Sequence, residues 1–560
     1  MTGGLSLPER RSAVAEECKW SSNRSIAGPS SGSRVRFGRC VATQRVAWLL
    51  RARSARVTSL LSLVVILTAA PAHGGQAENL AVSAGVTASE RSPRSENASP
   101  NIRRISEGSD YPLPSLQPLS QAADTGESRP WLVSLMLYTL YVIIFVVCVY
   151  IVRHYFFTLN RLFRRPRQPY VDVDTADWPG VTVLIPAHNE EPVIGDILEA
   201  LLDADYPKDK LTITPIDDRS TDQTNERIRE FEQRYPDVVK PFHRSDGPAG
   251  KAAALNDATR EVETDIVLVF DADYVPGRGL LKQLVAPFFD PEVGAVMGRV
   301  VPHNTDINLL TRLLDLERAG GYQVDQQARM NLHLVPQYGG TVGGVRKRAL
   351  MSVGGWRDDA LAEDTDATYR LLLGGWKTVY QNRSECYEQV PEEWDGRLRQ
   401  IKRWAMGHNQ ATARYGAGLL RNRRTSFLEK IDGMLLLGVY TVSPVLLLGW
   451  MLGIVLWYLG EVKPGLIVIL LVTSYSTIGN FATFYEVAAA ARLDGSRGRI
   501  RLLPFVFLGF LVSLFAVSRA TLSQILPRKR SEELMWHKTE HNHNHNHIHI
   551  PNRNQNGLRE

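Results

Sequence analysis

Four long apolar runs constrain this chain more than any other feature of its sequence. Each run is at or above the ~20 residues that a membrane-spanning helix needs. The runs predict transmembrane helices at 131–152, 431–460 and 465–485, and a transmembrane or re-entrant helix at 502–526. The chain is therefore expected to lie in a lipid bilayer, and a wholly soluble globular fold is excluded.

The termini and the stretch before the first span show a different composition. A shorter apolar run ends at Ala70-Pro-Ala72, the small-x-small pattern of a signal-peptidase site. Segment 57–74 is interpreted as a signal peptide or a signal anchor, and both stay open. Few large apolar residues occur at 75–128, too few to offset chain entropy. We expect an unstructured leader at 1–56, a disordered linker at 75–128 and a disordered, His/Asn-rich tail at 530–560, with weak metal binding by that tail less favoured.

The net charge of +6 gathers in short basic clusters that flank the apolar runs. Such clusters are typical of juxtamembrane anchoring and argue against a nucleic-acid partner. Arginines are dense just after the first span, so the positive-inside rule places the following domain in the cytoplasm. We expect a multi-pass protein of the inner (plasma) membrane. The four cysteines have no CxxC spacing, which indicates neither a disulfide framework nor a zinc site.

Residues 178–410 alternate strand-like and helix-like patterns. Runs rich in β-branched residues are separated by helical runs such as 192–202 and 221–235. This alternation predicts an α/β domain with a mixed, mostly parallel sheet, embedded between the transmembrane helices. Ligands of such sheets bind at the carboxyl ends of the strands. We predict the strands at 181–185, 211–216, 265–270 and 293–297.

Three acidic motifs fall at or near those strand ends. Asp217 and Asp218 end the second predicted strand, where two like charges repel unless a donor-rich ligand or a cation lies between them. Asp271 and Asp273 end the third; in extended backbone, residues i and i+2 point the same way, so both carboxylates can hold one Mg²⁺ or Mn²⁺. Glu363-Asp364 precedes a helical stretch, where a mere partnership with the helix dipole is the alternative.

Two further motifs have competing interpretations. Gln400-Ile-Lys-Arg-Trp404 lies before an apolar run and suits either an interfacial anchor or a working part of a site. The glycine-rich stretch 339–344 lacks the GxGxxG spacing, which excludes a dinucleotide fingerprint.

Taken together, the motifs Asp217-Asp218, Asp271-Ala-Asp273, Glu363-Asp364 and Gln400-Ile-Lys-Arg-Trp404 resemble the D, DxD, ED and QxxRW series of family 2 glycosyltransferases. The resemblance is to the processive branch, which includes cellulose, hyaluronan and poly-N-acetylglucosamine synthases. It covers roughly 178–540, whereas 1–128 has no counterpart. Ala362 departs from the common pattern, in which a threonine is frequent, with little effect expected because the carboxylates remain.

This resemblance implies a GT-A fold that binds a nucleotide sugar, with UDP-glucose or UDP-N-acetylglucosamine favoured. It also implies Mg²⁺ or Mn²⁺ on Asp271 and Asp273, which neutralises the diphosphate. The residues expected to bind the nucleotide sugar are Pro186, Glu190, Asp217, Asp218, Lys251 and Arg403.

For catalysis, the resemblance implies that Asp364, with Glu363 beside it, takes the proton from the acceptor hydroxyl in an inverting transfer. Gln400 and Trp404 are expected to bind the acceptor. The main hypothesis is a processive enzyme that extends and exports a β-linked polysaccharide. The alternatives are a non-processive enzyme that glycosylates a lipid and a catalytically silent membrane scaffold or export component.

The topology signals around 502–526 conflict. Three full spans after the cytoplasmic domain place the C-terminus outside, yet arginines flank both ends of this run. Trp536-His-Lys-Thr539 also resembles a WxKT motif found on the cytoplasmic side in related synthases. We therefore expect a cytoplasmic C-terminus and a re-entrant or interfacial helix at 502–526, which carries Pro504 and Arg519.

Overall fold

The computed structural model describes residues 130–168, 177–477, 483–495 and 497–525. The predicted leader, the segment 57–74, the linker and the tail with Trp536-His-Lys-Thr539 all lie outside the described residues.

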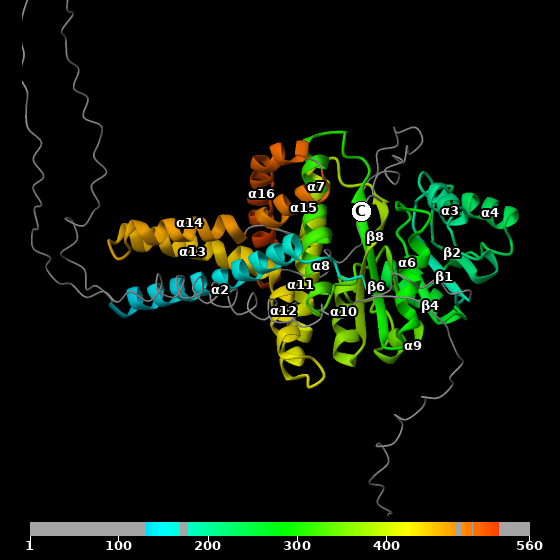
Figure 1. Cartoon of the computed structure of the whole chain (residues 1–560), viewed down its shortest axis with the longest axis horizontal. Coiled ribbons are helices and arrows are strands. Elements are labelled where there is room, and N and C mark those ends of the chain that lie inside the picture. The colour runs from blue at the N-terminus through cyan, green and yellow to red at the C-terminus, as the bar shows by residue number, and fades with distance from the viewer. Residues whose placement is uncertain (1–129, 169–176, 478–482, 496, 526–560) are drawn as a thin grey trace, which may run out of the picture. The chain divides into compact units, whose positions relative to one another are not determined.

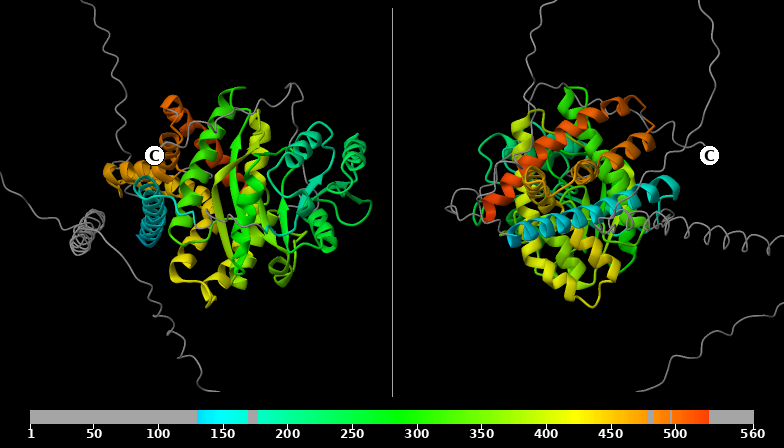
Figure 2. Two further views of the ribbon diagram at one scale, coloured as in Figure 1. Left: turned by 45° about the vertical axis from the view of Figure 1, so that its right-hand side comes forward. Right: turned by 90° about the vertical axis from the view of Figure 1, so that its left-hand side faces the viewer.

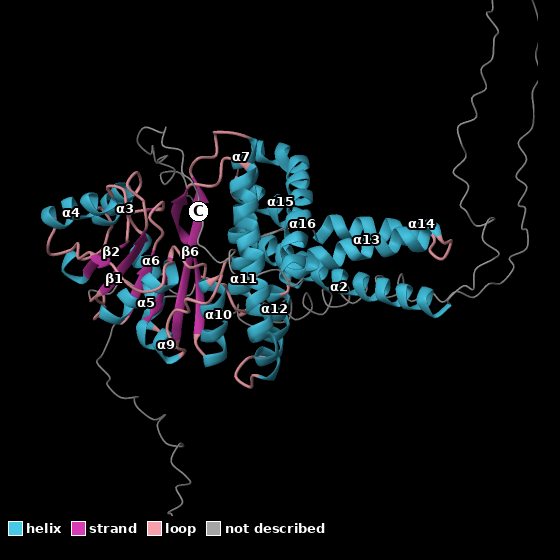
Figure 3. Cartoon of the chain, turned by 180° about the vertical axis from the view of Figure 1, so that it is seen from behind, coloured by secondary structure: helices cyan, strands magenta, loops and turns pink. Residues whose placement is uncertain are grey.

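One eight-stranded sheet forms the centre of the α/β domain (Figure 3), with the strand order β3-β2-β1-β4-β7-β6-β8-β5. Parallel pairs join β1 to β2 and β4, β2 to β3, and β6 to β8, whereas β7 runs antiparallel to β4 and β6. The strands are β1 (Val181–Ala187), β2 (Leu211–Asp218), β3 (Phe242–Arg244), β4 (Ile266–Val269), β5 (Val275–Pro276), β6 (Val293–Pro302), β7 (Gly343–Arg346) and β8 (Lys377–Glu388). The predicted mixed, mostly parallel sheet is confirmed.

Close packing explains the glycine pair at the start of β7. A Cβ on Gly343 would lie 2.5 Å from the carbonyl oxygen of Val296, and one on Gly344 would lie 2.5 Å from Cδ2 of Leu268. Real Cβ atoms do not approach other atoms so closely, so β7 fits between β4 and β6 only because it begins with glycines.

Helices cover the sheet, and apolar side chains from both layers form its core (Figure 1). Strands β1 and β4 are buried on both faces of the sheet. Their sequences are therefore nearly all apolar and do not alternate between apolar and polar residues. The helices of the domain are α3 (Ile194–Leu202), α4 (Thr224–Arg234), α5 (Lys251–Glu261), α6 (Leu280–Val285), α7 (Leu309–Ala319), the π-helix η4 (Gly320–Gln326), α8 (Gln327–Asn331), α9 (Lys347–Ser352), α10 (Glu363–Gly374) and α11 (Trp394–Arg421).

The apolar runs form helices whose limits differ from the predicted ones. The long helix α2 (Pro130–Phe163) replaces the span 131–152. The run 431–460 is not one helix, because the chain bends at Gly438 between α12 (Phe427–Leu437) and the short turn η5 (Val439–Thr441) that leads into α13 (Val442–Tyr458). The run 465–485 gives α14 (Pro464–Thr477) and the start of α15 (Phe484–Leu493). The remaining helices are η6 (Arg497–Leu502) and α16 (Leu503–Ile525).

Among the described residues, the stretches Pro130–Phe163, Val439–Tyr458 and Gly498–Ile525 are helices long and apolar enough to cross a membrane. Helices α2, α13 and α14 pack on one another and extend together away from the sheet (Figure 1). In contrast, α16 runs across α13 and α14, as both views of Figure 2 show, and it packs against α11.

The side chains of α16 divide into two faces. One face is buried against the neighbouring helices, whereas the other exposes large apolar side chains at helical spacing: Phe505, Leu508, Val512, Phe515 and Leu522. A helix with one apolar face left uncovered is typical of a membrane contact.

Candidate active site

A cavity of about 2210 Å³ lies at the carboxyl ends of the strands and extends to the membrane helices. It brings together most residues that the sequence analysis selected, although they come from seven different elements and loops. The selected residues that line it are Pro186, Glu190, Asp218, Lys251, Asp271, Asp273, Glu363, Asp364, Gln400, Arg403 and Trp404.

The two neighbouring aspartates at the end of β2 have different surroundings. Asp218 lines the cavity, and its carboxylate accepts hydrogen bonds from Arg244 Nη1 at 2.8 Å and from Arg219 Nε at 3.0 Å. Asp217 does not line it; its carboxylate contacts the backbone N–H of Ser220 at 3.1 Å and His243 Nδ1 at 2.7 Å. The two carboxylates thus have separate contacts, and only that of Asp218 is paired with arginines.

Asp271-Ala-Asp273 forms a turn after β4, not a continuation of the strand. The backbone N–H of Tyr274 donates to the carbonyl oxygen of Asp271, so the predicted extended i, i+2 geometry is wrong. The turn is held in place by the hydroxyl of Thr341, which accepts from the backbone N–H of Asp271 at 3.0 Å.

Lys251 occupies the space between two acidic motifs. Its Nζ lies 2.6 Å from Asp271 Oδ1 and 3.4 Å from Glu363 Oε1. These carboxylates raise the pKa of the lysine although burial acts against its charge. The ammonium group is therefore a fixed positive charge that holds the start of α10 next to the turn after β4.

Several acidic side chains lie near Asp273. Burial and the nearby charges of Asp271, Glu190 and Glu388 raise the pKa of Asp273 well above its usual range. Such a crowd of carboxylates favours either a bound proton or an added cation, and an all-oxygen donor set is the kind that Mg²⁺ and Mn²⁺ prefer.

Asp364 lies in the first turn of α10, where its Oδ1 accepts the backbone N–H of Thr365 at 2.6 Å. Burial and the neighbouring Glu363 raise the pKa of Asp364 to about 6, against the opposing effect of Lys251 and Arg403. Gly340, with φ +72°, lets the preceding loop approach closely, since a Cβ there would lie 3.0 Å from Cβ of Asp364. A carboxylate with a pKa near neutrality is suited to exchange a proton at physiological pH.

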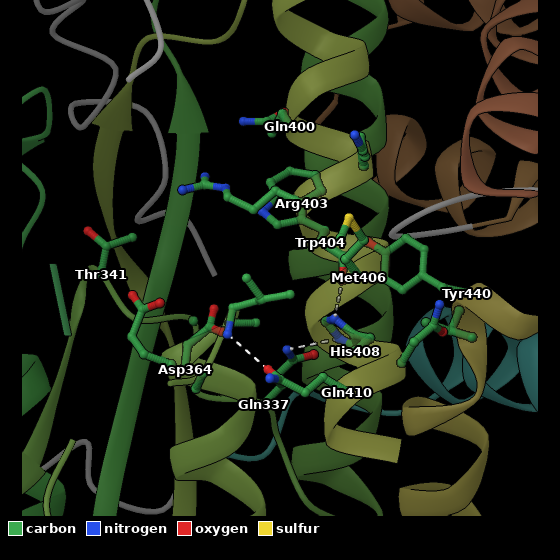
Figure 4. Close-up of a pocket in the computed structure, with 18 of the residues that line it drawn as sticks. Gln337, Thr341, Asp364, Gln400, Arg403, Trp404, Met406, His408, Gln410 and Tyr440 are labelled. Carbon is green, nitrogen blue, oxygen red and sulfur yellow. Dashed lines mark hydrogen bonds between the residues drawn. The ribbon is translucent and has the colours of Figure 1, made fainter. Parts of the chain in front are cut away.

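The motif Gln400-Ile-Lys-Arg-Trp404 lies within α11, and Figure 4 shows Arg403 and Trp404 facing the same pocket as Asp364. Arg403 is exposed, whereas Trp404 is half-buried. The guanidinium carbons of Arg318 and Arg397 lie 5.1 and 5.2 Å from the indole centroid. Gln400 Oε1 accepts a hydrogen bond from Arg397 Nη1 at 2.7 Å.

The sequence analysis missed a buried ion pair beside the acidic turn. Arg318 donates to both oxygens of the Glu388 carboxylate, at 2.6 and 3.1 Å, and the hydroxyl of Tyr274 donates to Oε2 at 2.8 Å. An arginine on α7 and a glutamate at the end of β8 carry no spacing signal, because the pair forms only when the sheet is assembled.

A polar bridge between α10 and α11 was also missed. Gln337 Nε2 lies 3.0 Å from Thr365 Oγ1 and 3.4 Å from His408 Nε2, and the His408 ring meets the Tyr440 ring edge-on with centroids 4.9 Å apart. Figure 4 shows Gln337 between Asp364 on one side and His408 on the other. Burial lowers the pKa of His408 to about 4, so its imidazole is neutral at physiological pH.

Among the described residues, one group of three His, Asp or Glu side chains has metal-ligand spacing. Ligand atoms of His154, Asp325 and Glu486 lie within 4.8 Å of one another. His154 Nδ1 lies 2.9 Å from Glu486, and Asp325 pairs with Arg153 at 2.9 Å and with Arg329 at 2.8 Å. These partners give the group a structural role in fastening α2 to the domain and to α15.

Residues 179–407 match the family described as "Glycosyltransferase like family 2". Among curated proteins, the probable glycosyltransferase YdaM of Bacillus subtilis (strain 168) is 35% identical over 251 residues, which cover 44% of this chain and 60% of that protein. The beta-monoglucosyldiacylglycerol synthase of Synechocystis sp. is 33% identical over 239 residues, 43% of this chain and 50% of that protein. Each alignment thus covers only part of its relative's length.

Among solved structures, the mannosyltransferase PcManGT from Pyrobaculum calidifontis, in complex with GDP-Man and Mn²⁺, is similar with a TM-score of 0.46 and 21% identity. The match covers 70% of this chain and 99% of that one. The family match, together with the strand order and the acidic turn after β4, identifies residues 179–407 as a family 2 glycosyltransferase domain of the GT-A type. The processive branch that the sequence analysis named is not shown by these comparisons.

Proposed function

We propose that this chain is a membrane-bound inverting glycosyltransferase that moves a single sugar from a nucleotide sugar to the hydroxyl group of a lipid. The observation that carries the proposal is the continuity of one cavity, which runs from the acidic turn after β4 to aliphatic side chains of the membrane helices. Relatives named beta-monoglucosyldiacylglycerol synthases support a lipid acceptor and favour glucose as the sugar. The lipid acceptor, an alternative in the sequence analysis, thus becomes the main hypothesis.

The donor binds at the end of the cavity formed by β1, β2 and β4. Pro186, Glu190 and Asp218 line this end and hold the nucleoside in our proposal. Asp217 is left out of the binding set because its carboxylate supports the turn after β2.

Asp271 and Asp273 hold Mg²⁺ or Mn²⁺ in this proposal. When bound, the metal neutralises the diphosphate and stabilises its departure. Lys251 and the exposed Arg403 lie on the same cavity and add positive charge toward the leaving group.

Asp364 acts as the general base. It accepts the proton of the acceptor hydroxyl while the hydroxyl oxygen forms a bond to the anomeric carbon. The bond between that carbon and the diphosphate oxygen breaks, and its electron pair leaves with the nucleoside diphosphate. Attack from the face opposite the leaving group inverts the anomeric configuration.

The arrangement of helices supports a membrane topology for this scheme. With α2, α13 and α14 placed along the membrane normal, the crosswise helix α16 lies in the interface, and its exposed apolar face contacts one leaflet. In this proposal the α/β domain lies on the cytoplasmic side of the inner membrane.

The test is a transfer assay with the full chain in lipid nanodiscs that contain diacylglycerol, supplied with radiolabelled UDP-glucose or UDP-N-acetylglucosamine and Mg²⁺ or Mn²⁺. We expect a lipid that carries one sugar, identified by thin-layer chromatography and mass spectrometry. A long polymer as the main product would overturn the lipid proposal in favour of the processive hypothesis. Failure to release UDP from any donor would leave the scaffold alternative.

A further inference from the structure

We infer that the membrane end of the cavity is a binding site for the acyl chains of the acceptor, formed by one face of the α12–η5–α13 segment. This inference rests on the proposed lipid acceptor and deepens it. The residues that form this face, here called the acyl stripe, are Leu435, Leu436, Val439, Val442, Ser443 and Leu446.

The spacing of the acyl stripe gives it one common face. Leu436, Val439, Ser443 and Leu446 follow one another at intervals of three or four residues, so helical geometry stacks them in a single row. The row continues through η5 although the helix is interrupted at Gly438. All of its members line the cavity, together with Leu514 of α16.

Polarity changes in order along the cavity. Carboxylates dominate the donor end, and Asp364 lies where that end meets Gln337 and His408. His408 is uncharged at physiological pH and packs against Tyr440, which lies in η5 two residues before the start of α13. From there the acyl stripe is aliphatic apart from Ser443, while Tyr150, Arg153 and His154 of α2 also line the cavity. Arg153 is neutralised by its ion pairs with Asp325 and Asp432. An amphiphile with a hydroxyl next to its acyl chains suits this arrangement, because its hydroxyl can reach Asp364 while its chains pack against the acyl stripe.

The cavity is also too large for the donor alone. Pockets for drug-sized ligands have volumes of roughly 300–1,000 Å³, whereas this cavity measures about 2210 Å³. The remaining space includes the acyl stripe and leaves room for a second ligand. A neutral diacyl lipid with a free hydroxyl is the class that fits.

The first experiment blocks the acyl stripe. Ser443→Trp places an indole in the row, and we expect transfer to diacylglycerol in nanodiscs to fall about tenfold or more, because an added large side chain displaces the ligand. UDP affinity, measured by calorimetry, is expected to stay unchanged. Leu448→Trp on the same helix is the matched control: Leu448 is 45% exposed and does not line the cavity. Equal activity of the two variants would overturn the inference.

The second experiment needs no variant. A diacylglycerol with a photoreactive diazirine on its acyl chain is irradiated with the wild-type chain, and the labelled peptides are mapped by mass spectrometry. Labels at 435–446 and around Leu514, reduced by excess unlabelled diacylglycerol, are the expected result. Labels confined to the exposed face of α16 would overturn the inference while leaving lipid transfer intact. Lack of transfer to any lipid would instead overturn the proposed function, and the mapped labels would still report whether the acyl stripe binds acyl chains.

Discussion

The two ends of the cavity are built from opposite kinds of side chain. At the donor end, acidic residues lie close together and are balanced by Lys251, Arg244 and Arg318. At the membrane end, aliphatic side chains of α13 and α16 meet, and the nearest charged groups of the cavity lining, Arg153 and Asp325, are paired with each other. In our proposal, the charges at the donor end determine the free energy of binding of the nucleotide sugar, and the apolar area at the membrane end determines that of the lipid. We therefore expect a substitution at one end of the cavity to weaken the binding of the substrate at that end only.

Removing divalent cations is expected to have the largest effect, and only at the donor end. Excess chelator should stop sugar transfer, and added Mg²⁺ or Mn²⁺ should restore it, because Asp271 and Asp273 would otherwise face the diphosphate uncompensated. Labelling by the acyl probe should persist in chelator. Full transfer under these conditions would contradict a metal-dependent donor end.

Asp364→Asn tests the point where the two ends meet. Turnover should fall by roughly 10²–10⁴-fold, the usual contribution of a general base. The amide oxygen can still accept the N–H of Thr365, so the start of α10 should persist. UDP affinity by calorimetry and acyl labelling should both match the wild type. A variant with normal turnover would remove Asp364 from the mechanism.

The pKa of Asp364 predicts an acid limit on activity. A general base works when deprotonated, so with a pKa of about 6 transfer should fall about tenfold between roughly pH 7 and pH 5. The stability effect has the opposite sign: a raised pKa means that the folded protein favours the protonated carboxyl, so this group destabilises the fold as the pH rises toward 6. We therefore expect Asp364→Asn not to lower the melting temperature at neutral pH. A flat rate profile over this range would exclude Asp364 as the titrating base.

Trp404 should give the smallest effect. Its indole contacts two guanidinium groups and lines the cavity between the two ends. Aromatic contacts contribute about 0.5–1.5 kcal/mol beyond area burial, or roughly two- to tenfold. Trp404→Ala should lower product yield by this factor and UDP affinity less, whereas Trp404→Phe should keep part of both. If Trp404→Ala gives normal yield, the residue is only an interfacial anchor.

The donor end was the more predictable of the two, because its residues follow strands in short motifs. Even at this end, the local geometry could not be predicted. Asp271 and Asp273 lie in a turn, and Asp218 lines the cavity whereas Asp217 does not. Sequence spacing identifies which residues gather at a sheet edge but not the path of the loop that carries them.

The membrane end escaped prediction for a different reason. Hydropathy treats every apolar residue in 431–460 alike, although Leu448 is exposed and Leu446 is buried against the cavity. The bend at Gly438 also has no pattern of its own in an apolar run. Gln337 lies in a loop without periodicity, so its bridge to His408 appears only once the chain is folded.

The π-helix η4 joins α7 to α8, so that the three elements form one continuous rod. In α7, Arg318 pairs with Glu388. At the end of η4, Gln326 Nε2 donates a hydrogen bond to the carbonyl oxygen of Gln337 at 2.9 Å. In α8, Arg329 pairs with Asp325. A π-turn holds one more residue than an α-turn. This wider turn absorbs the extra residue while the rod continues from α7 into α8. The rod therefore links the Arg318–Glu388 ion pair to the contact between Gln326 and Gln337, and η4 is the wider turn between them.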